Sequence, residues 1–475
     1  MLFNSPEFLI FFVVVFSIYC TLAFRAQNVF LLAASLFFYA WWDWRFVFLL
    51  TATTSIDYIA GARIHAATSD PVRKRWLIAS LACNLLVLGF FKYFNFFVGS
   101  FVELLNRLNL HVPAWQVEII LPLGISFYTF QSMAYAIDIY RRKLAPAQSF
   151  LNYFLFVCFF PHLIAGPINR PDSLLAQVEH PRRMSWQQWS EGALLILFGL
   201  FKKICVADVV APFVDRAFSD PAQFNWQSLI LGAYLFAVQI YADFSGYSDI
   251  ARGLAKIFGF ELVVNFNQPY FSRNPAEFWQ RWHISLSRWL RDYLYIPLGG
   301  NRKGELRTYM NLLAVMLLGG LWHGANWTFV VWGAFHGAWL AAHRWWRERL
   351  ARIRDDGGHV ASTLQSLLFV VITFHIVTLL WIYFRSSDIA TAHLYFSRLF
   401  GAQGQPFATL YQLFTLAWPI GMLFLLIDYP QWRAGDHLAL LRWRLPARGA
   451  AIAMLALALL AVRPDARPPF IYFQF

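Results

Sequence analysis

The chain has 475 residues, of which 59% are hydrophobic and only 14% are charged. Soluble domains carry about 25% charged residues, so this composition excludes an ordinary soluble protein and predicts an integral membrane protein. The formal net charge of +13 comes from short basic clusters between apolar stretches, a pattern typical of cytoplasmic loops that argues against nucleic acid as a partner.

Apolar stretches close to the ~20 residues of a membrane-spanning helix recur along the whole chain. We expect spans near residues 8–24, 28–41, 46–62, 76–93, 118–139, 150–165, 190–209, 227–247, 309–322, 326–342, 363–384, 408–428 and 449–462. The predicted fold class is all-α, a polytopic membrane protein with about 11–13 transmembrane or re-entrant helices. We expect one membrane-embedded domain over 1–475, with N-terminal spans in 1–117, a motif-rich core in 118–345 and C-terminal spans in 346–475.

Basic clusters predict the orientation of these spans, because Lys and Arg concentrate in cytoplasmic loops. Assigning the clusters at 73–75, 141–143 and 344–354 to the cytoplasm places the N-terminus and the C-terminus outside. Two outside termini require an even number of crossings, so one candidate fails to cross. We expect this to be 150–165, which Pro161 interrupts.

The signatures of several other chemistries do not occur in the sequence. The four cysteines lie singly, with no C-x-x-C pair, and no H-E-x-x-H motif is present, so neither a disulfide framework nor a metal site is predicted. No G-x-S-x-G motif marks a serine nucleophile. The glycine-bearing basic loop 299–304 does not match a P-loop.

Polar groups at membrane depth are costly, so each is a candidate for function. His323 lies in an apolar stretch beside Gly319, Gly320 and Gly324, which permit close approach of backbone or substrate. Its imidazole can take a proton from a hydroxyl and return it to a leaving group. The residues alone leave two readings equally open, a catalytic base and a buried histidine hydrogen-bonded to a carbonyl or to Asn326.

His283 is the second candidate, in the segment Trp-His-Ile-Ser-Leu-Ser. Chemistry alone favours a structural role for it, as the partner of Glu277 or Asp292. His162 is expected to support a turn, and His336 to be a packing residue whose hydrogen bonds are satisfied.

Asp243 and Asp249 are candidates for a proton relay within an apolar stretch. Pairing with Arg252, or capping of a broken helix, is the more ordinary interpretation. The sequence does not decide between these readings.

Long motifs occur in order along the chain: 38–42 (FYAWW), 121–131 (LPLGISFYTFQ), 160–167 (FPHLIAGP), 243–249 (DFSGYSD), 278–302 (FWQRWHISLSRWLRDYLYIPLGGNR), 318–327 (LGGLWHGANW) and 332–337 (WGAFHG). Together these motifs resemble the membrane-bound O-acyltransferase (MBOAT) family and, within it, the alginate O-acetyltransferase branch. The resemblance covers most of the chain.

The resemblance implies a many-helix fold in which a funnel from each face meets near a catalytic histidine. His323 corresponds to the essential histidine of the family, and His283 occupies its second polar position. The implied reaction carries an acyl group from a cytosolic thioester to an acceptor hydroxyl, with acetyl-CoA as the donor and no other cofactor bound. The implied setting is the lipid bilayer of the bacterial inner membrane, with periplasmic or membrane-anchored acetyltransferase partner proteins and an extracellular polysaccharide as final acceptor.

The last residues, 470–475, read FIYFQF, an F-x-Y-x-x-F pattern. This pattern is similar to the C-terminal motif of the small partner protein in the teichoic-acid D-alanylation system, whose tyrosine is taken to carry the acyl group. The resemblance implies that Tyr472 is an acyl-carrying acceptor on the outer face. The alternative is an aromatic tail that anchors the chain at the membrane interface.

Other functions remain open from the sequence. Within the family they are D-alanyl transfer to teichoic acid and O-acetylation of peptidoglycan or cellulose. Outside the family, a transporter or lipid flippase also has broken helices and polar groups at mid-membrane. No internal pseudo-repeat is visible, which argues against that class.

Overall fold

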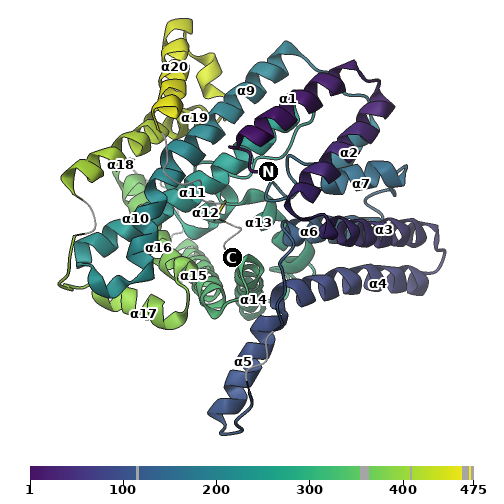
Figure 1. Ribbon diagram of the computed structural model, residues 1–475. Helices are drawn as coiled ribbons and strands as arrows, with labels where there is room; N and C mark the ends of the chain where they lie inside the picture. Colours follow the sequence, from purple (N-terminus) through teal and green to yellow (C-terminus); the bar gives the residue numbers. More distant parts are fainter. Residues whose placement is uncertain (114–116, 354–362, 407–408, 463–469, 472–475) are drawn as a thin grey trace. The chain divides into compact units, whose positions relative to one another are not determined.

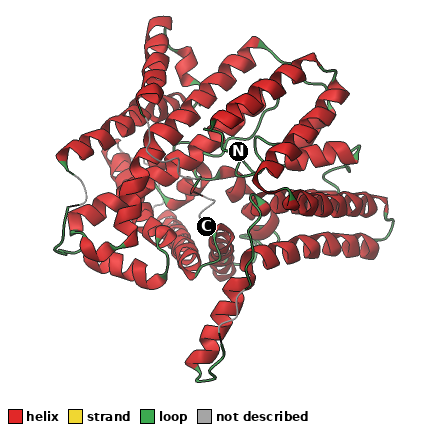
Figure 2. Ribbon diagram, in the orientation of Figure 1, coloured by secondary structure: helices red, strands yellow, loops and turns green. Residues whose placement is uncertain are grey.

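The structure, a computed structural model, describes residues 1–113, 117–353, 363–406, 409–462 and 470–471. Within these ranges every named element of secondary structure is a helix, and Figure 2 shows these helices joined by loops. The all-α prediction is therefore confirmed. Among the described residues, four helical stretches are long and apolar enough to cross a membrane, namely Asp70–Arg107, Trp226–Ile257, Thr363–Arg385 and Gln412–Ala434.

The chain divides into two compact units. The N-terminal unit comprises 1–193 and 250–263, and the C-terminal unit comprises 194–249 and 264–475. The divisions fall inside two helices, α9 (Trp186–Leu200) and α11 (Trp226–Ile257), so each helix contributes residues to both units. The prediction of one membrane-embedded domain with three regions stays a prediction.

The N-terminal unit is built from mostly apolar helices joined by turns and loops. They are α1 (Pro6–Thr21), α2 (Phe24–Asp43), α3 (Arg45–Ala66), α4 (Asp70–Leu88), the π-helix η1 (Gly89–Tyr93), α5 (Phe94–Arg107), α6 (Ile125–Tyr140), α7 (Phe150–Cys158), the π-helix η2 (Pro171–Leu175) and α8 (Ala176–Glu179). Figure 1 shows α3 and α4 side by side. The buried carboxylate of Asp57 joins them, since it accepts hydrogen bonds from Ser80 Oγ at 2.6 Å and Asn84 Nδ2 at 2.8 Å.

Two predicted spans of this unit differ from the observed helices. The span expected from residue 118 begins as a helix only at Ile125, because Gly124 adopts a left-handed conformation with φ of 75° and lies against the backbone of Leu163. The helix expected over 150–165 ends at Cys158, shortly before Pro161. The interruption is thus confirmed, whereas the number of crossings and the orientation of the termini stay predictions.

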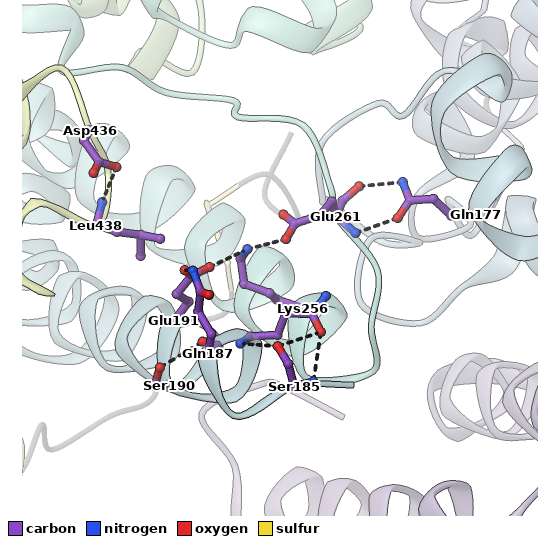
Figure 3. Close-up of polar contacts among 10 residues, drawn as sticks. Gln177, Ser185, Gln187, Ser190, Glu191, Lys256, Glu261, Asp436 and Leu438 are labelled. Atoms are coloured by element: carbon purple, nitrogen blue, oxygen red, sulfur yellow. Dashed lines mark hydrogen bonds and ion pairs between the residues drawn. The ribbon is translucent and has the colours of Figure 1, made fainter. Parts of the chain in front are cut away.

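A buried lysine ties the segment 250–263 to the rest of the N-terminal unit (Figure 3). Lys256 Nζ lies 2.7 Å from Glu191 Oε2 on α9 and also forms an ion pair with Glu261. Gln177 bonds to both backbone groups of Glu261, donating to the carbonyl at 3.0 Å and accepting from the N–H at 2.7 Å. The end of α11 is therefore held to this unit by charge and by backbone hydrogen bonds.

The C-terminal unit alternates long helices with short, irregular ones. After its share of α9 and α11, it contains η3 (Phe201–Ala207), α10 (Asp208–Ser219), η4 (Pro221–Gln223), η5 (Pro269–Phe271), α12 (Pro275–Arg281), α13 (Ile284–Leu290), η6 (Arg291–Tyr295), α14 (Glu305–His323), α15 (Trp327–Ile353), α16 (Thr363–Arg385), α17 (Ile389–Arg398), α18 (Leu410–Met422), η7 (Leu423–Asp428), α19 (Tyr429–Ala434), η8 (Ala439–Arg442) and α20 (Leu445–Ala461). The polar stretch after residue 265 consists of the short helices η5, α12, α13 and η6.

Helices α14 and α15 form a closely packed pair (Figure 1). A Cβ atom at Gly320 would lie 2.2 Å from the carbonyl oxygen of Phe329, and one at Gly333 would lie 2.2 Å from that of Met316. Small residues at such positions let helix backbones approach closely inside a membrane. The expectation that glycines beside His323 allow close backbone approach is therefore confirmed at Gly320.

We expect Gly320→Ala to destabilise the protein, because the added methyl group meets backbone rather than a movable side chain. Overpacking of this kind costs about 1–3 kcal/mol. Thermal unfolding in detergent should show a lower midpoint than for the unmodified protein. The control is Gly421→Ala in α18, where an added Cβ has no neighbour within 4 Å; equal midpoints for the two variants would contradict the packing argument.

Candidate functional site

His283 occupies a strained turn in the C-terminal unit, directly before α13. It is fully buried and adopts a left-handed conformation with φ of 41° and ψ of 55°. This conformation costs a residue other than glycine roughly 1–2 kcal/mol and persists only where the surroundings impose it. Asn265 imposes it here, since its carbonyl oxygen accepts the N–H of Ile284 at 2.9 Å and its Oδ1 accepts the N–H of Ser285 at 3.2 Å.

Asn265 also orients the imidazole ring of His283. Its Oδ1 lies 3.2 Å from His283 Nδ1 and accepts the Ser285 hydroxyl at 2.9 Å, while its Nδ2 donates to Ser248 Oγ at 3.4 Å. This pattern identifies Oδ1 as an acceptor, so Nδ1 of His283 carries the proton and Nε2 carries the lone pair. Asn265 is a functional candidate that the sequence analysis missed.

His323 is the last residue of α14 and is 3% exposed. Its ring centroid lies 5.0 Å from that of Trp322, 5.3 Å from that of Trp332 and 5.3 Å from that of Phe384. The ring of His283 lies 6.3 Å away. The fold therefore brings the two predicted catalytic histidines together inside an aromatic enclosure, where low polarity strengthens electrostatic interactions.

His336 belongs to the same enclosure, although it was expected only to pack. It is fully buried, and its ring lies 4.7 Å from that of Trp332 and 5.2 Å from that of Trp279. Burial among apolar rings is as expected. Neither ring nitrogen has a hydrogen-bond partner among the residues that the structure describes, so the expectation of satisfied hydrogen bonds stays a prediction.

The alternative partners considered for His283 are engaged elsewhere. Glu277, on α12 outside the candidate spans, forms ion pairs with Arg273 at 3.2 Å and Arg281 at 2.9 Å. Burial by itself would raise the pKa of Glu277, but hydrogen bonds from Arg273 and the charges of both guanidinium groups lower it below the ordinary value. Asp292 pairs with Arg291 at 2.7 Å.

Buried ion pairs surround the two aspartates singled out in the sequence. Asp249 pairs with Lys202 at 2.8 Å, and Asp243 pairs with Lys203 at 3.1 Å. Lys203 also lies 2.8 Å from Asp208. Both lysines belong to the π-helix η3, and the sequence analysis passed over them because they stand inside an apolar stretch. Buried charges need such partners, so these aspartates are paired groups.

The predicted acceptor Tyr472 lies outside the described residues, but the two residues before it are described. Phe470 is 3% exposed and Ile471 is 1% exposed. The ring of Phe470 lies 5.6 Å from that of Phe244 and 4.8 Å from that of Tyr247. Because the ring of Phe244 lies 4.7 Å from that of His283, the end of the described chain packs one ring away from the histidine pair.

Comparisons with known proteins identify the family of this chain. The model of the membrane-bound O-acyltransferase family matches residues 142–384, which contain both histidines. The probable alginate O-acetylase of Azotobacter vinelandii is 43% identical over 405 residues, covering 84% of this chain and 78% of the relative.

A second probable alginate O-acetylase, from Pseudomonas aeruginosa, is also 43% identical, with 84% of this chain and 75% of the relative covered. The peptidoglycan O-acetyltransferase of Helicobacter pylori is 36% identical over 436 residues, which cover 85% of this chain and 80% of the relative. The family match spans half of the chain and these relatives are covered over most of their length. The chain therefore belongs to the membrane-bound O-acyltransferase family and is a multi-pass membrane acyltransferase.

Proposed function

We propose that this protein takes an acetyl group from cytosolic acetyl-CoA and passes it across the bacterial inner membrane, for O-acetylation of an alginate-like extracellular polysaccharide. The observation that carries the proposal is the buried pair His283 and His323, whose rings lie 6.3 Å apart in an aromatic enclosure. The names of the alginate O-acetylase relatives support acetyl as the acyl group and a polysaccharide as its destination.

His323 is proposed as the general base, with Tyr472 as the first acceptor. One imidazole nitrogen takes the proton of the acceptor hydroxyl, and the oxygen attacks the thioester carbonyl carbon. A C–O bond forms, the C–S bond breaks, and the thiolate of coenzyme A recovers the proton from the imidazolium. The products are free coenzyme A and an acetyl ester on the tyrosine, ready for transfer by a periplasmic or membrane-anchored partner enzyme.

His283 is proposed to orient the acetyl-CoA donor. With its Nδ1 proton directed at Asn265 Oδ1 at 3.2 Å, the neutral ring presents an acceptor at Nε2. An acceptor suits the amide N–H groups of the pantetheine arm better than it suits a developing oxyanion, which needs a donor. Orientation of the acetyl-CoA donor is therefore a better supported role for His283 than stabilisation of the oxyanion.

Peptidoglycan is the second candidate polymer, because a relative at 36% identity is named a peptidoglycan O-acetyltransferase. Teichoic-acid D-alanylation and cellulose acetylation remain alternatives within the family, and the chemistry at the histidine pair is the same in each. The acceptor polymer is therefore selected by the partner that receives the acyl group.

We expect His323→Ala to lower acetyl transfer by about 10²–10⁴-fold, the range for loss of a positioned general base. The assay incubates membranes with labelled acetyl-CoA and follows ester formation, with protein abundance measured in parallel. The matched control is His375→Ala on α16, an exposed histidine whose Nδ1 bonds to the carbonyl of Val371 at 2.7 Å. Normal transfer by the His323 variant would rule out its catalytic role.

Asn265→Ala should reduce transfer by roughly 10–100-fold, as loss of a hydrogen bond that orients a functional imidazole typically does. Asn265→Asp keeps an acceptor oxygen opposite His283 Nδ1 and should retain more activity. Rates are compared at equal protein abundance, with Asn301→Ala on an exposed turn as control. If the alanine and aspartate variants were equally active, Asn265 would not act through this hydrogen bond.

Tyr472→Phe removes a single hydroxyl, so we expect no acetyl ester on the protein and no acetylated polysaccharide in cells. Tyr429→Phe, a partly exposed position on α19, serves as the control and should behave like the unmodified protein. Mass spectrometry of the C-terminal peptide and analysis of polysaccharide ester content measure the two steps. Full polysaccharide acetylation by the Tyr472 variant would exclude this residue as acceptor.

A further inference from the structure

A hydrogen bond joins the end of the described chain to the middle of α11. The backbone N–H of Ile471 donates to Asp243 Oδ2 at 2.7 Å, across 228 positions of sequence. Both residues are buried, with 1% and 2% of their surface exposed. Hydrogen bonds to an ionised acceptor are roughly twice as strong as neutral ones, and they strengthen further away from water.

The charges around Asp243 make its carboxylate a suitable acceptor for a peptide N–H. Its other oxygen lies 3.1 Å from Lys203 Nζ, and the same Lys203 also lies 2.8 Å from Asp208. One lysine between two carboxylates leaves one formal negative charge in this trio. A buried negative charge favours an N–H donor over an apolar neighbour.

Aromatic packing adds side-chain selectivity to this backbone contact. Phe470 lies against Phe244 and Tyr247, with ring centroids 5.6 and 4.8 Å apart. Asp243 and Tyr247 stand four residues apart on α11, so they share one face of the helix. A single face of α11 therefore holds both the ring of Phe470 and the N–H of Ile471.

We propose that Asp243, Phe244 and Tyr247 form a docking site for the C-terminal segment, with Asp243 as a positioning residue that fixes Ile471. This proposal rests on the proposed role of Tyr472 as acyl acceptor. Since the ring of Phe244 is 4.7 Å from that of His283, the described part of a segment docked here ends one aromatic ring away from the histidine pair. Lys203 acts through Asp243 by holding its carboxylate in place.

The direct test is digestion of the purified protein in lipid nanodiscs by a carboxypeptidase, followed by intact-mass spectrometry. Asp243→Ala removes the hydrogen-bond acceptor of the Ile471 N–H and leaves residues 470–475 unchanged. We therefore expect carboxypeptidase to remove residues 470–475 at least about tenfold faster from this variant. Asp243→Asn keeps an acceptor oxygen and should restore much of the protection. Asp215→Ala, which removes an exposed partner of Arg385, should digest at the unmodified rate.

Digestion of Asp243→Ala at the unmodified rate would overturn the proposal. Digestion reports docking whether or not Tyr472 is acylated, so failure of the acceptor role, seen with Tyr472→Phe, is a separate result. If Asp243→Ala does not fold, as judged by thermal unfolding, Ile471→Pro removes the donor from the tail and leaves the buried ion pairs intact.

Ile471→Val is the matched control for Ile471→Pro, because it keeps the backbone N–H and a branched side chain. We expect the proline variant to form acetyl ester on Tyr472 at least about tenfold more slowly than the valine variant. Ester formation on Tyr472 at equal, measurable rates in the two variants would also overturn the docking site.

Discussion

The candidate site depends on one backbone constraint, the left-handed turn at His283 that Asn265 holds in place. Without the bonds from Ile284 and Ser285 to Asn265, a non-glycine residue would leave that conformation. The same amide sets the tautomer of the imidazole. The backbone geometry of the turn and the position of the ring proton therefore both depend on the single side chain of Asn265, which holds the imidazole beside His323.

Near this turn, the C-terminal unit contains an aromatic enclosure and a separate group of buried ion pairs. Aromatic rings, among them Trp332 and Phe384, enclose His323. The buried ion pairs join lysines of η3 to aspartates of α11. The same helix, α11, carries Phe244, whose ring lies next to that of His283. An enclosure of this kind suits acyl transfer, because water would otherwise hydrolyse the thioester, while the charged groups give a chain end a defined place to bind.

The fold class was predictable from the sequence, because the composition indicated an integral membrane protein built from helices. Apolar spacing located most of the long helices, and the motifs singled out His283 and His323, whose rings the fold brings to within 6.3 Å of each other. The sequence did not reveal the amphipathic helix α5, because Glu103 and Arg107 interrupt its apolar pattern. Nor did it reveal Asn265, because a polar residue ahead of a polar segment carries no local signal of the turn it stabilises.

The paired lysines of η3 were missed for a related reason. Lys202 and Lys203 look unfavourable in an apolar stretch until their partners are known. Lys202 pairs with Asp249, 47 positions along the chain, and Lys203 pairs with Asp243 on the same distant helix, α11. Local patterns specify helices well, whereas bonds between distant residues appear only in the folded chain. The contact of Ile471 with Asp243 is another example, spanning 228 positions.

Histidine-dependent acetyl transfer to Tyr472 can be measured by mass spectrometry of purified protein after brief exposure to acetyl-CoA. We expect one acetyl ester on the C-terminal peptide, located at Tyr472, and no ester when His323 is replaced by alanine. An ester that forms equally in both proteins, or that never forms on Tyr472 while the polysaccharide is still acetylated, would contradict this expectation.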